Sequence, residues 1–310
     1  MKILITGGTG LIGSTLINAL LTDGHEISVL TRNVDKARDT LPSGVLPFQW
    51  DGATPQGWDH LIPDTDAVIN LAGESLAGEG VVEIMTKHWN TEYKKRIRES
   101  RAGVGNALVA AIEKAEKKPK VFIQASAVGY YGPRGDEKVS ETSGGADDFL
   151  AETCRLWEDS TKKLDEMGVR RAVIRTGLVL SEEGGILPMV LLPFRLFAGG
   201  PLGNGKQYVS WIHMDDQVNA IRFLLNNEDA SGAYNLTAPN PLTQREQAKV
   251  IGRVMRRPSF VPVPGFALKL VLGEKSTLVL DGQRVIPQKL EAEGFEFKFT
   301  DFESALSALL

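Results

Sequence analysis

The first thirteen residues constrain the fold of this chain more than any other stretch. A short apolar run, Ile3 to Ile5, is followed by glycines at positions 7, 8, 10 and 13, and Leu11 to Leu21 then carries apolar residues at helical spacing. This order predicts a strand, a glycine turn and a helix. The free N–H groups and partial positive charge of a helix N-terminus suit a pyrophosphate, and glycines let the backbone approach it closely. The pattern therefore favours a dinucleotide-binding turn over an ordinary glycine-rich loop, with contacts predicted from Gly7, Thr9, Gly10, Leu11, Ile12 and Gly13.

Further apolar runs predict more strands of the same sheet. They are separated by turn-forming residues and by helical periodicity, as in a parallel sheet whose strands alternate with helices. The predicted strands after the first cover 26–30, 46–50, 67–71, 121–125 and 172–180. Helices are expected over 83–114, from about Asp216 with that residue as N-cap, and after a cap at Thr243. The sequence therefore predicts an α/β fold with a doubly wound parallel (Rossmann) sheet.

The end of the second predicted strand carries Thr31 and Arg32, where a dinucleotide fold meets the adenosine ribose. An acidic residue there would bind the 2′-hydroxyl of NAD, whereas an arginine pairs with the 2′-phosphate of NADP. Lys36 and Arg38 follow closely. The alternative is a solvated arginine on a loop. The sequence therefore predicts NADP as the cofactor.

Other predicted cofactor contacts lie where later strands end. Asp51 is a candidate partner of the adenine amino group, although a turn-forming Asp-Gly pair explains it nearly as well. The small residues at 71–73 allow a cofactor to lie against the backbone. Arg101 is expected to point inward from the 83–114 helix, and Leu178 to run past the nicotinamide. These contacts add Asp51, Leu71, Ala72, Gly73, Arg101 and Leu178 to the predicted site.

Charge and cysteine content exclude several classes of protein. The formal net charge of −4 argues against a duplex nucleic-acid binder, which normally has a basic face. The single cysteine, Cys154, excludes an internal disulfide, and the four histidines have no zinc-ligand spacing, so no metal site is predicted. The first strand begins too early to follow a signal peptide, and prolines and an arginine interrupt the longest apolar run. We therefore expect neither a nucleic-acid nor a membrane partner, and we expect a cytoplasmic protein.

Several motifs together resemble the extended short-chain dehydrogenase/reductase superfamily. Those of the first half are the glycine turn, Asn70-Leu-Ala-Gly73, and Ser126 followed by Tyr131-Gly132. Those similar to the sugar-nucleotide epimerase branch are Arg175-Thr-Gly-Leu-Val-Leu180, Trp211-Ile-His-Met-Asp-Asp216 and Gly232-Ala-Tyr-Asn-Leu236. The ending, with Gly282-Gln-Arg-Val-Ile-Pro287 and Gly294-Phe, resembles an atypical NAD-dependent epimerase-like family with an uncharacterised C-terminal domain. The resemblance covers essentially the whole chain.

The sequence departs from this superfamily at the catalytic pair. The superfamily uses Tyr-x-x-x-Lys, in which the lysine lowers the pKa of the tyrosine that transfers a proton. The corresponding stretch here is Phe149-Leu-Ala-Glu-Thr153, and Ser100 replaces the assisting asparagine. Neither Phe149 nor Thr153 can perform the missing roles.

Proton transfer in such an enzyme would have to come from other groups. Ser126 with Tyr131 is the predicted catalytic set, with Tyr130 and Glu74 as alternatives, although both tyrosines can equally be walls of the pocket. His213 is expected to be structural, bonded to a backbone carbonyl.

Two functions follow from this pattern. The leading hypothesis is an NADP-binding oxidoreductase or epimerase-like enzyme acting on a small polar, sugar-like substrate. The alternative is a catalytically silent NADP-binding redox sensor or regulatory protein, which the missing pair favours and the retained substrate lobe opposes. The predicted Rossmann domain covers residues 1–240, and its segment 181–205 joins residues 241–310 in a smaller substrate lobe. The oligomeric state is left open.

Overall fold

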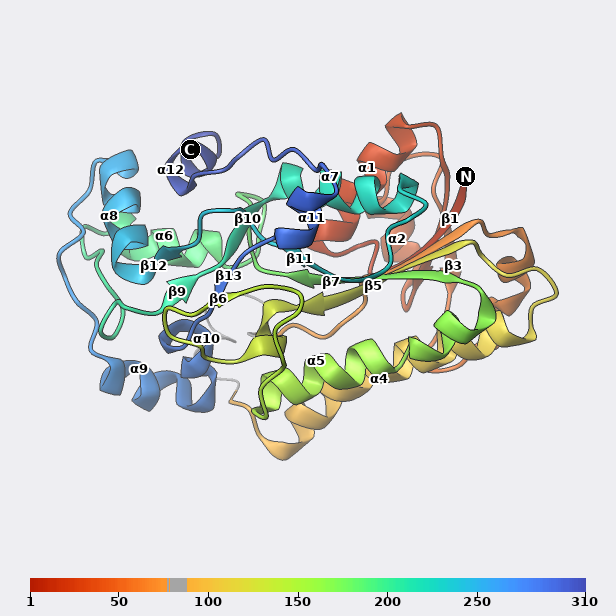
Figure 1. Cartoon of the computed structure of the whole chain (residues 1–310), viewed down its shortest axis with the longest axis horizontal. Helices are drawn as coiled ribbons and strands as arrows, with labels where there is room; N and C mark the ends of the chain where they lie inside the picture. Colours follow the sequence, from red (N-terminus) through yellow and green to blue (C-terminus); the bar gives the residue numbers. More distant parts are fainter. Residues whose placement is uncertain (77, 79–87) are drawn as a thin grey trace.

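The computed structural model describes residues 1–76, 78 and 88–310. Its centre is a seven-stranded sheet with the order β11-β7-β5-β4-β1-β2-β3, in which every neighbouring pair is parallel (Figure 1). The strands are β1 (Lys2–Thr6), β2 (Glu26–Thr31), β3 (Leu46–Gln49), β4 (Ala67–Asn70), β5 (Val121–Ala127), β7 (Arg170–Thr176) and β11 (Gly232–Leu236).

Helices cover both faces of this sheet, because its central strands bury side chains on both sides. Helices α1 (Leu11–Thr22) and α7 (Met214–Asn226) pack on one face, where their apolar side chains join those of the strands in one core cluster. Helices α4 (Thr91–Lys114) and α5 (Phe149–Asp159) run along the other face (Figure 1). This arrangement confirms the predicted doubly wound α/β fold.

Two strands differ from the sequence predictions. The predicted sixth strand, 172–180, is interrupted at Gly177, where a Cβ would lie 2.5 Å from the carbonyl oxygen of Ser210. Its second half, β8 (Leu178–Leu180), leaves the main sheet and pairs with β10 (Trp211–His213). The seventh strand, β11, was not predicted, and it completes the sheet beside β7.

The helix predictions hold in type but not in every boundary. The helix expected over 83–114 is α4, which begins at Thr91 with Asn90 as its cap, and residues 83–87 lie outside the described residues. Helix α7 is capped by the side chain of His213, so the prediction that Asp216 caps it is wrong. Asp216 is buried instead and accepts the backbone N–H groups of Lys298 and Phe299. Thr243 caps its helix as predicted.

The smaller lobe joins segments that are far apart in the sequence. Side chains of α6 (Leu187–Arg195), α8 (Gln244–Met255) and α12 (Phe302–Ser307) share one buried cluster. The division at residue 240 stays a prediction. Among the described residues, the remaining α-helices are α2 (Val34–Thr40), α9 (Gly265–Leu272), α10 (Thr277–Leu280) and α11 (Gln288–Ala292), and the short strands are β6 (Lys138–Val139), β9 (Tyr208–Val209), β12 (Leu242–Thr243) and β13 (Arg284–Val285). Within the described ranges, none of the helices is both long and apolar enough to span a bilayer.

Candidate functional site

The turn between β1 and α1 leaves no room for a side chain at two glycines. Gly7 has a φ of +71°, and a Cβ on it would lie 2.8 Å from the carbonyl group of Leu71 at the end of β4. A Cβ on Gly13 would lie 2.3 Å from the carbonyl oxygen of Gly7. The turn is therefore packed against itself and against the end of β4, at the carboxyl edge of the sheet.

Helix α1 begins with backbone donors that have no partner. Its N-cap, Gly10, makes no side-chain hydrogen bond, and its first turn has no acidic residue. Among the described residues, nothing accepts a hydrogen bond from the N–H groups of Leu11, Ile12 and Gly13. Thr9 lies exposed beside them. Three free donors and the positive end of the helix dipole form a cradle suited to an anionic phosphate.

Arg32 lies exposed at the end of β2, and no described residue accepts a hydrogen bond or forms an ion pair with its guanidinium. The neighbouring hydroxyl of Thr31 is used locally, because it donates to the carbonyl oxygen of Asn33 and accepts the Asn33 N–H. Arg32 is thus the free cation at this strand end within the described chain.

Asp51 organises its own loop. Its carboxylate accepts the backbone N–H groups of Ala53 and Thr54 and the Thr54 hydroxyl, and these bonds lower the pKa of Asp51 to about 2. The geometry supports the turn-forming alternative for Asp51.

Arg101 is buried, as the helical pattern predicts, and it holds the loop after β4. Its Nη2 donates to the carbonyl oxygen of Glu74, its Nη1 donates to that of Ile97, and its guanidinium packs over the Trp157 ring. Gly73 lies against it, because a Cβ there would be 3.2 Å from the Arg101 Cζ. Burial lowers the pKa of Arg101. Arg101 thus holds the loop at Gly73 and Glu74, whereas Thr6 of β1 accepts the N–H groups of Leu71 and Ala72 through its carbonyl oxygen and its hydroxyl.

Three neighbouring strands bring polar side chains to one face of the sheet. Ser126 of β5 is in register with Arg175 of β7, which is in register with Asn235 of β11. Glu158 of α5 joins this row. Its Oε1 accepts hydrogen bonds from the Ser126 hydroxyl at 2.6 Å and from Arg175 Nε at 2.9 Å. Its Oε2 accepts a hydrogen bond from Arg175 Nη2 at 2.8 Å.

Tyr131 completes this buried row. Arg175 Nη1 donates to the Tyr131 hydroxyl at 3.0 Å, and that hydroxyl donates to Asn235 Oδ1 at 2.7 Å. The Tyr131 side chain is fully buried, which raises the pKa of its hydroxyl. The hydroxyls of Ser126 and Tyr131, predicted to be catalytic, are therefore brought into one network but are already bonded within the protein. This geometry favours structural roles for both.

Tyr130 is arranged differently from its neighbour. Its ring lies over the Arg175 guanidinium, with 3.6 Å between the ring centroid and Arg175 Cζ, and it meets the Tyr131 ring edge-on. Tyr130 is only half-buried, and its hydroxyl makes no hydrogen bond to a described residue. That hydroxyl is also absent from the buried polar atoms that lack a partner, so it is accessible. Tyr130 is therefore the tyrosine of this pair whose hydroxyl is open to a ligand.

Phe149 and Thr153, predicted to occupy the positions of the catalytic pair, are engaged in contacts within the protein. The Phe149 ring meets Trp89 edge-on, and Lys94 Nζ lies 4.7 Å from its centroid. Thr153 is 3% exposed, and its hydroxyl donates to the Phe149 carbonyl oxygen. A lysine at position 153 would thus have to bury its charge. Ser100, predicted to replace the assisting asparagine, accepts the Glu74 N–H, so it too holds the loop after β4.

The other candidates lie at the borders of this region. The Glu74 carboxylate is 3.7 Å from Arg96 Nε. Leu178 is half-buried at the start of β8, and its N–H donates to Ser210. The prediction that His213 bonds a backbone carbonyl is wrong, because its Nδ1 accepts the Asp215 N–H and its Nε2 is buried without a hydrogen-bond partner among the described residues. Its ring lies against Phe299, and burial lowers the pKa of His213.

Three members of the network were not among the predicted site residues: Glu158, Arg175 and Asn235. The sequence contained one signal for this network: Arg175 lies inside a predicted buried strand, and a buried arginine requires a partner for its charge. The identity of that partner, on a helix 17 residues earlier in the chain, has no local signature.

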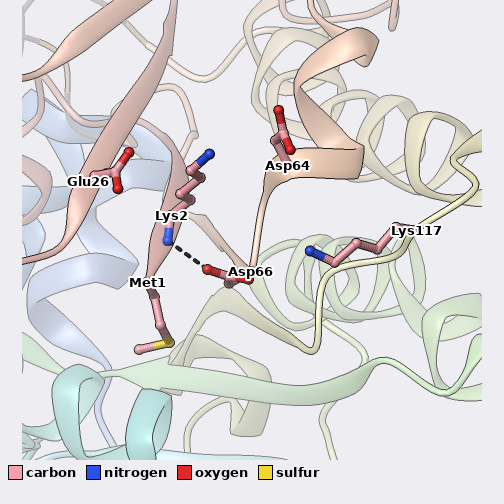
Figure 2. Close-up of a pocket in the computed structure, with 6 residues that line it drawn as sticks. All are labelled: Met1, Lys2, Glu26, Asp64, Asp66 and Lys117. Carbon is pink, nitrogen blue, oxygen red and sulfur yellow. Dashed lines mark hydrogen bonds between the residues drawn. The ribbon is translucent and has the colours of Figure 1, made fainter.

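An open hollow lies at the opposite, amino edge of the sheet. Figure 2 shows that acidic and basic side chains alternate around it and that the Lys2 N–H donates to Asp66. It contains none of the predicted site residues, so it lies apart from the cradle and the network. The hollow is lined by Met1, Lys2, Glu26, Asp64, Asp66 and Lys117.

Comparison with protein families matches nearly the whole chain. Residues 3–237 match the NAD dependent epimerase/dehydratase family, and residues 263–309 match a domain of unknown function, DUF1731. Both matches confirm the resemblance noted in the sequence.

Individual relatives match over their full lengths or nearly so. The chain is 40% identical to the epimerase family protein YfhF of Bacillus subtilis, covering 100% of this chain and 98% of that protein. It is 43% identical to the chloroplastic SDR39U1 homolog of Arabidopsis thaliana, covering 100% and 87%. The crystal structure of human epimerase family protein SDR39U1 with NADPH superposes with a TM-score of 0.87 at 32% identity, covering 100% of this chain and 99% of that one.

Proposed function

The chain belongs to the NAD dependent epimerase/dehydratase family, and we propose that it is an NADP(H)-binding oxidoreductase or epimerase-like enzyme that acts on a small polar, sugar-like substrate. The observation that carries the proposal is the cradle at the start of α1, with its three unpartnered N–H groups. Such donors would hold the pyrophosphate, and the nicotinamide, when bound, supplies or accepts the hydride.

The choice of NADP rests on Arg32. It lies at the strand end where the adenosine ribose is expected, and it has no acidic partner in the described chain. A free guanidinium favours a 2′-phosphate, which an NAD-specific acid would repel. The NADPH bound in the human relative supports the same assignment.

Tyr130 is the group we propose for proton transfer. A carbonyl substrate that receives a hydride also needs a proton on its oxygen, and a phenol hydroxyl is a suitable donor. Tyr130 has an open hydroxyl, and its ring is held on Arg175, which Glu158 fixes in turn. Arg175 is therefore a positioning residue, and the buried network orients the one accessible tyrosine of the pair.

The experiment compares two adjacent tyrosines. NADPH oxidation is followed at saturating cofactor across a panel of keto-sugars and small carbonyl compounds for the wild type, Tyr130→Phe and Tyr131→Phe. We expect Tyr130→Phe to reduce kcat by ~10²–10⁴ while the Kd for NADPH is unchanged. Tyr131→Phe, matched in chemistry, should lower stability and affect kcat far less. The reverse order of effects on kcat would contradict the assignment.

The second candidate is a catalytically silent NADPH-binding sensor. The packing of Phe149 and Thr153 in the catalytic slot favours it, because neither side chain can transfer a proton there. For a sensor, no member of the panel would be reduced, yet NADPH would still bind.

A further inference from the structure

Exposed apolar side chains concentrate at one end of the molecule. Of the twelve large apolar side chains that are exposed among the described residues, eight lie in two short segments. We call this set the apolar end: Leu192, Leu196, Phe197, Phe260, Val261, Phe266, Leu270 and Val271. Scattered apolar side chains are normal on a protein surface, but a gathered patch marks an interaction site.

Backbone hydrogen bonds tie the stretch after α6 to the stretch between α8 and α9. The Val261 N–H donates to the Gly199 carbonyl, and the Val263 N–H donates to that of Pro201. The Arg257 guanidinium lies 4.5 Å from the centroid of the Phe197 ring. In Figure 1, α6, α8, α9 and the connection from α8 to α9 form one end of the long axis, away from β1 and β3. No residue of α9 is buried, although its sequence is mostly apolar.

One member of the apolar end, Phe197, and the neighbouring Arg256 have left-handed backbone angles. Among the described residues, the non-glycine residues with positive φ are Phe197 at 60° and Arg256 at 53°. Helices commonly end in this conformation: Arg256 is the C-cap of α8, and Phe197 directly follows the C-cap of α6, so both angles mark helix ends. Both lie at the apolar end or directly beside it, and Phe197 is 60% exposed.

The two segments of the chain that carry the apolar end are rich in basic residues. Residues 184–206 and 247–273 contain seven Lys and Arg and no Asp or Glu, whereas the rest of the chain has 28 basic and 39 acidic residues, a net charge of −11. The basic residues are Arg195, Lys206, Lys249, Arg253, Arg256, Arg257 and Lys269, of which Arg253 is already paired with Glu303 of α12. A symmetric contact with a second copy would bring two such sets together, which like-charge repulsion opposes.

We propose that the apolar end docks on a membrane surface that contains anionic lipids. Exposed phenylalanine and leucine side chains would enter the boundary between headgroups and acyl chains, and the surrounding arginines and lysines would pair with lipid phosphates. Surface docking of this kind needs no helix that spans the bilayer. The proposal is independent of the enzymatic activity proposed above.

Flotation with lipid vesicles tests the proposal. The full chain is mixed with vesicles of phosphatidylcholine alone or of phosphatidylcholine with phosphatidylglycerol. We expect it to float only with the anionic vesicles, and binding to weaken as salt rises from 0.1 to 1 M and the screening length falls from ~10 to ~3 Å. Phe266→Ser/Leu270→Ser should weaken the partitioning about 10²-fold, because two apolar side chains no longer enter the interface.

A matched double variant controls for the loss of apolar surface as such. Leu46→Ser/Leu156→Ser removes side chains that are 59% and 44% exposed elsewhere and should float like the wild type. Equal losses in the two double variants, equal binding to neutral vesicles, or no binding at 0.1 M salt would overturn the proposal. The proposal would also be overturned if the chain did not bind vesicles but formed a concentration-dependent dimer, or a complex with an acidic protein, that Phe266→Ser/Leu270→Ser abolishes.

Discussion

Glu158 and Arg175 form a buried, two-point ion pair that ties α5 to the end of β7. The side chains are 13% and 7% exposed, and both carboxylate oxygens accept from the guanidinium, at 2.9 and 2.8 Å. The pair also receives the Ser126 hydroxyl, and Arg175 supports both tyrosines of the 130–131 pair. This one ion pair therefore contacts Ser126 directly and, through Arg175, holds both Tyr130 and Tyr131.

Removing the charge of Glu158 should be strongly destabilising. Glu158→Gln keeps the shape but leaves the Arg175 charge buried without a counter-ion, so we expect the free energy of unfolding to fall by about 3–5 kcal/mol. Chemical denaturation measures this change. The control is Glu152→Gln, which breaks the exposed ion pair with Arg98 and should cost less than about 1 kcal/mol. Similar small losses in both variants would mean that Arg175 does not depend on Glu158.

Two glycines of the turn should respond differently to alanine. A Cβ on Gly10 meets only the Gly7 carbonyl oxygen, at 3.2 Å, so Gly10→Ala should fold with a stability within about 1 kcal/mol of the wild type and bind NADPH at least ~10-fold more weakly. Gly13→Ala collides with backbone at 2.3 Å and should lose about 1–3 kcal/mol of stability. Thermal unfolding and nucleotide titration separate the two effects. A stable Gly13→Ala protein would show that the turn can relax.

His213 should make stability depend on pH on the acid side of neutrality. Burial lowers its pKa below the ordinary value of 6.5, so the unfolded chain takes up the proton first as the pH falls. Stability should therefore be unaffected by His213 above about pH 7 and decrease below 6.5, by up to ~1.4 kcal/mol per pH unit, until the lowered pKa is reached. His213→Asn retains a side chain able to cap α7 and removes this titration. Its unfolding free energy should fall less between pH 7 and 5 than that of the wild type, and parallel curves would contradict the account.

Local patterns were sufficient to predict the strands and the glycine turn that form the cradle. The glycines around Gly7 and Gly13, the apolar runs and the small residues after β4 each act through neighbours close in sequence, and the sheet contains the strands that they predict. By contrast, β11 was missed because Gly232–Leu236 is short, begins with glycine and is ordinary in composition.

The proton-transfer half depends on contacts between distant segments. Nothing near Ser126 or Tyr131 indicates that Glu158 and Asn235 already bind their hydroxyls, since these partners lie 32 and 104 residues away. The register of β5, β7 and β11 decides which face each side chain takes, and that register is a property of the assembled sheet. For the same reason, Tyr130 and Tyr131 cannot be distinguished from their sequence alone.

Calorimetric titration of NADPH and NADH shows whether Arg32 selects the cofactor. We expect wild-type protein to bind NADPH more tightly, and Arg32→Ala to remove most of the difference, about 1.5–3 kcal/mol for one charge-assisted phosphate contact. Arg38→Ala, which removes an exposed arginine already near Asp35, should keep the preference. Equal wild-type affinities for the two nucleotides, or a preference that survives Arg32→Ala unchanged, would contradict the account.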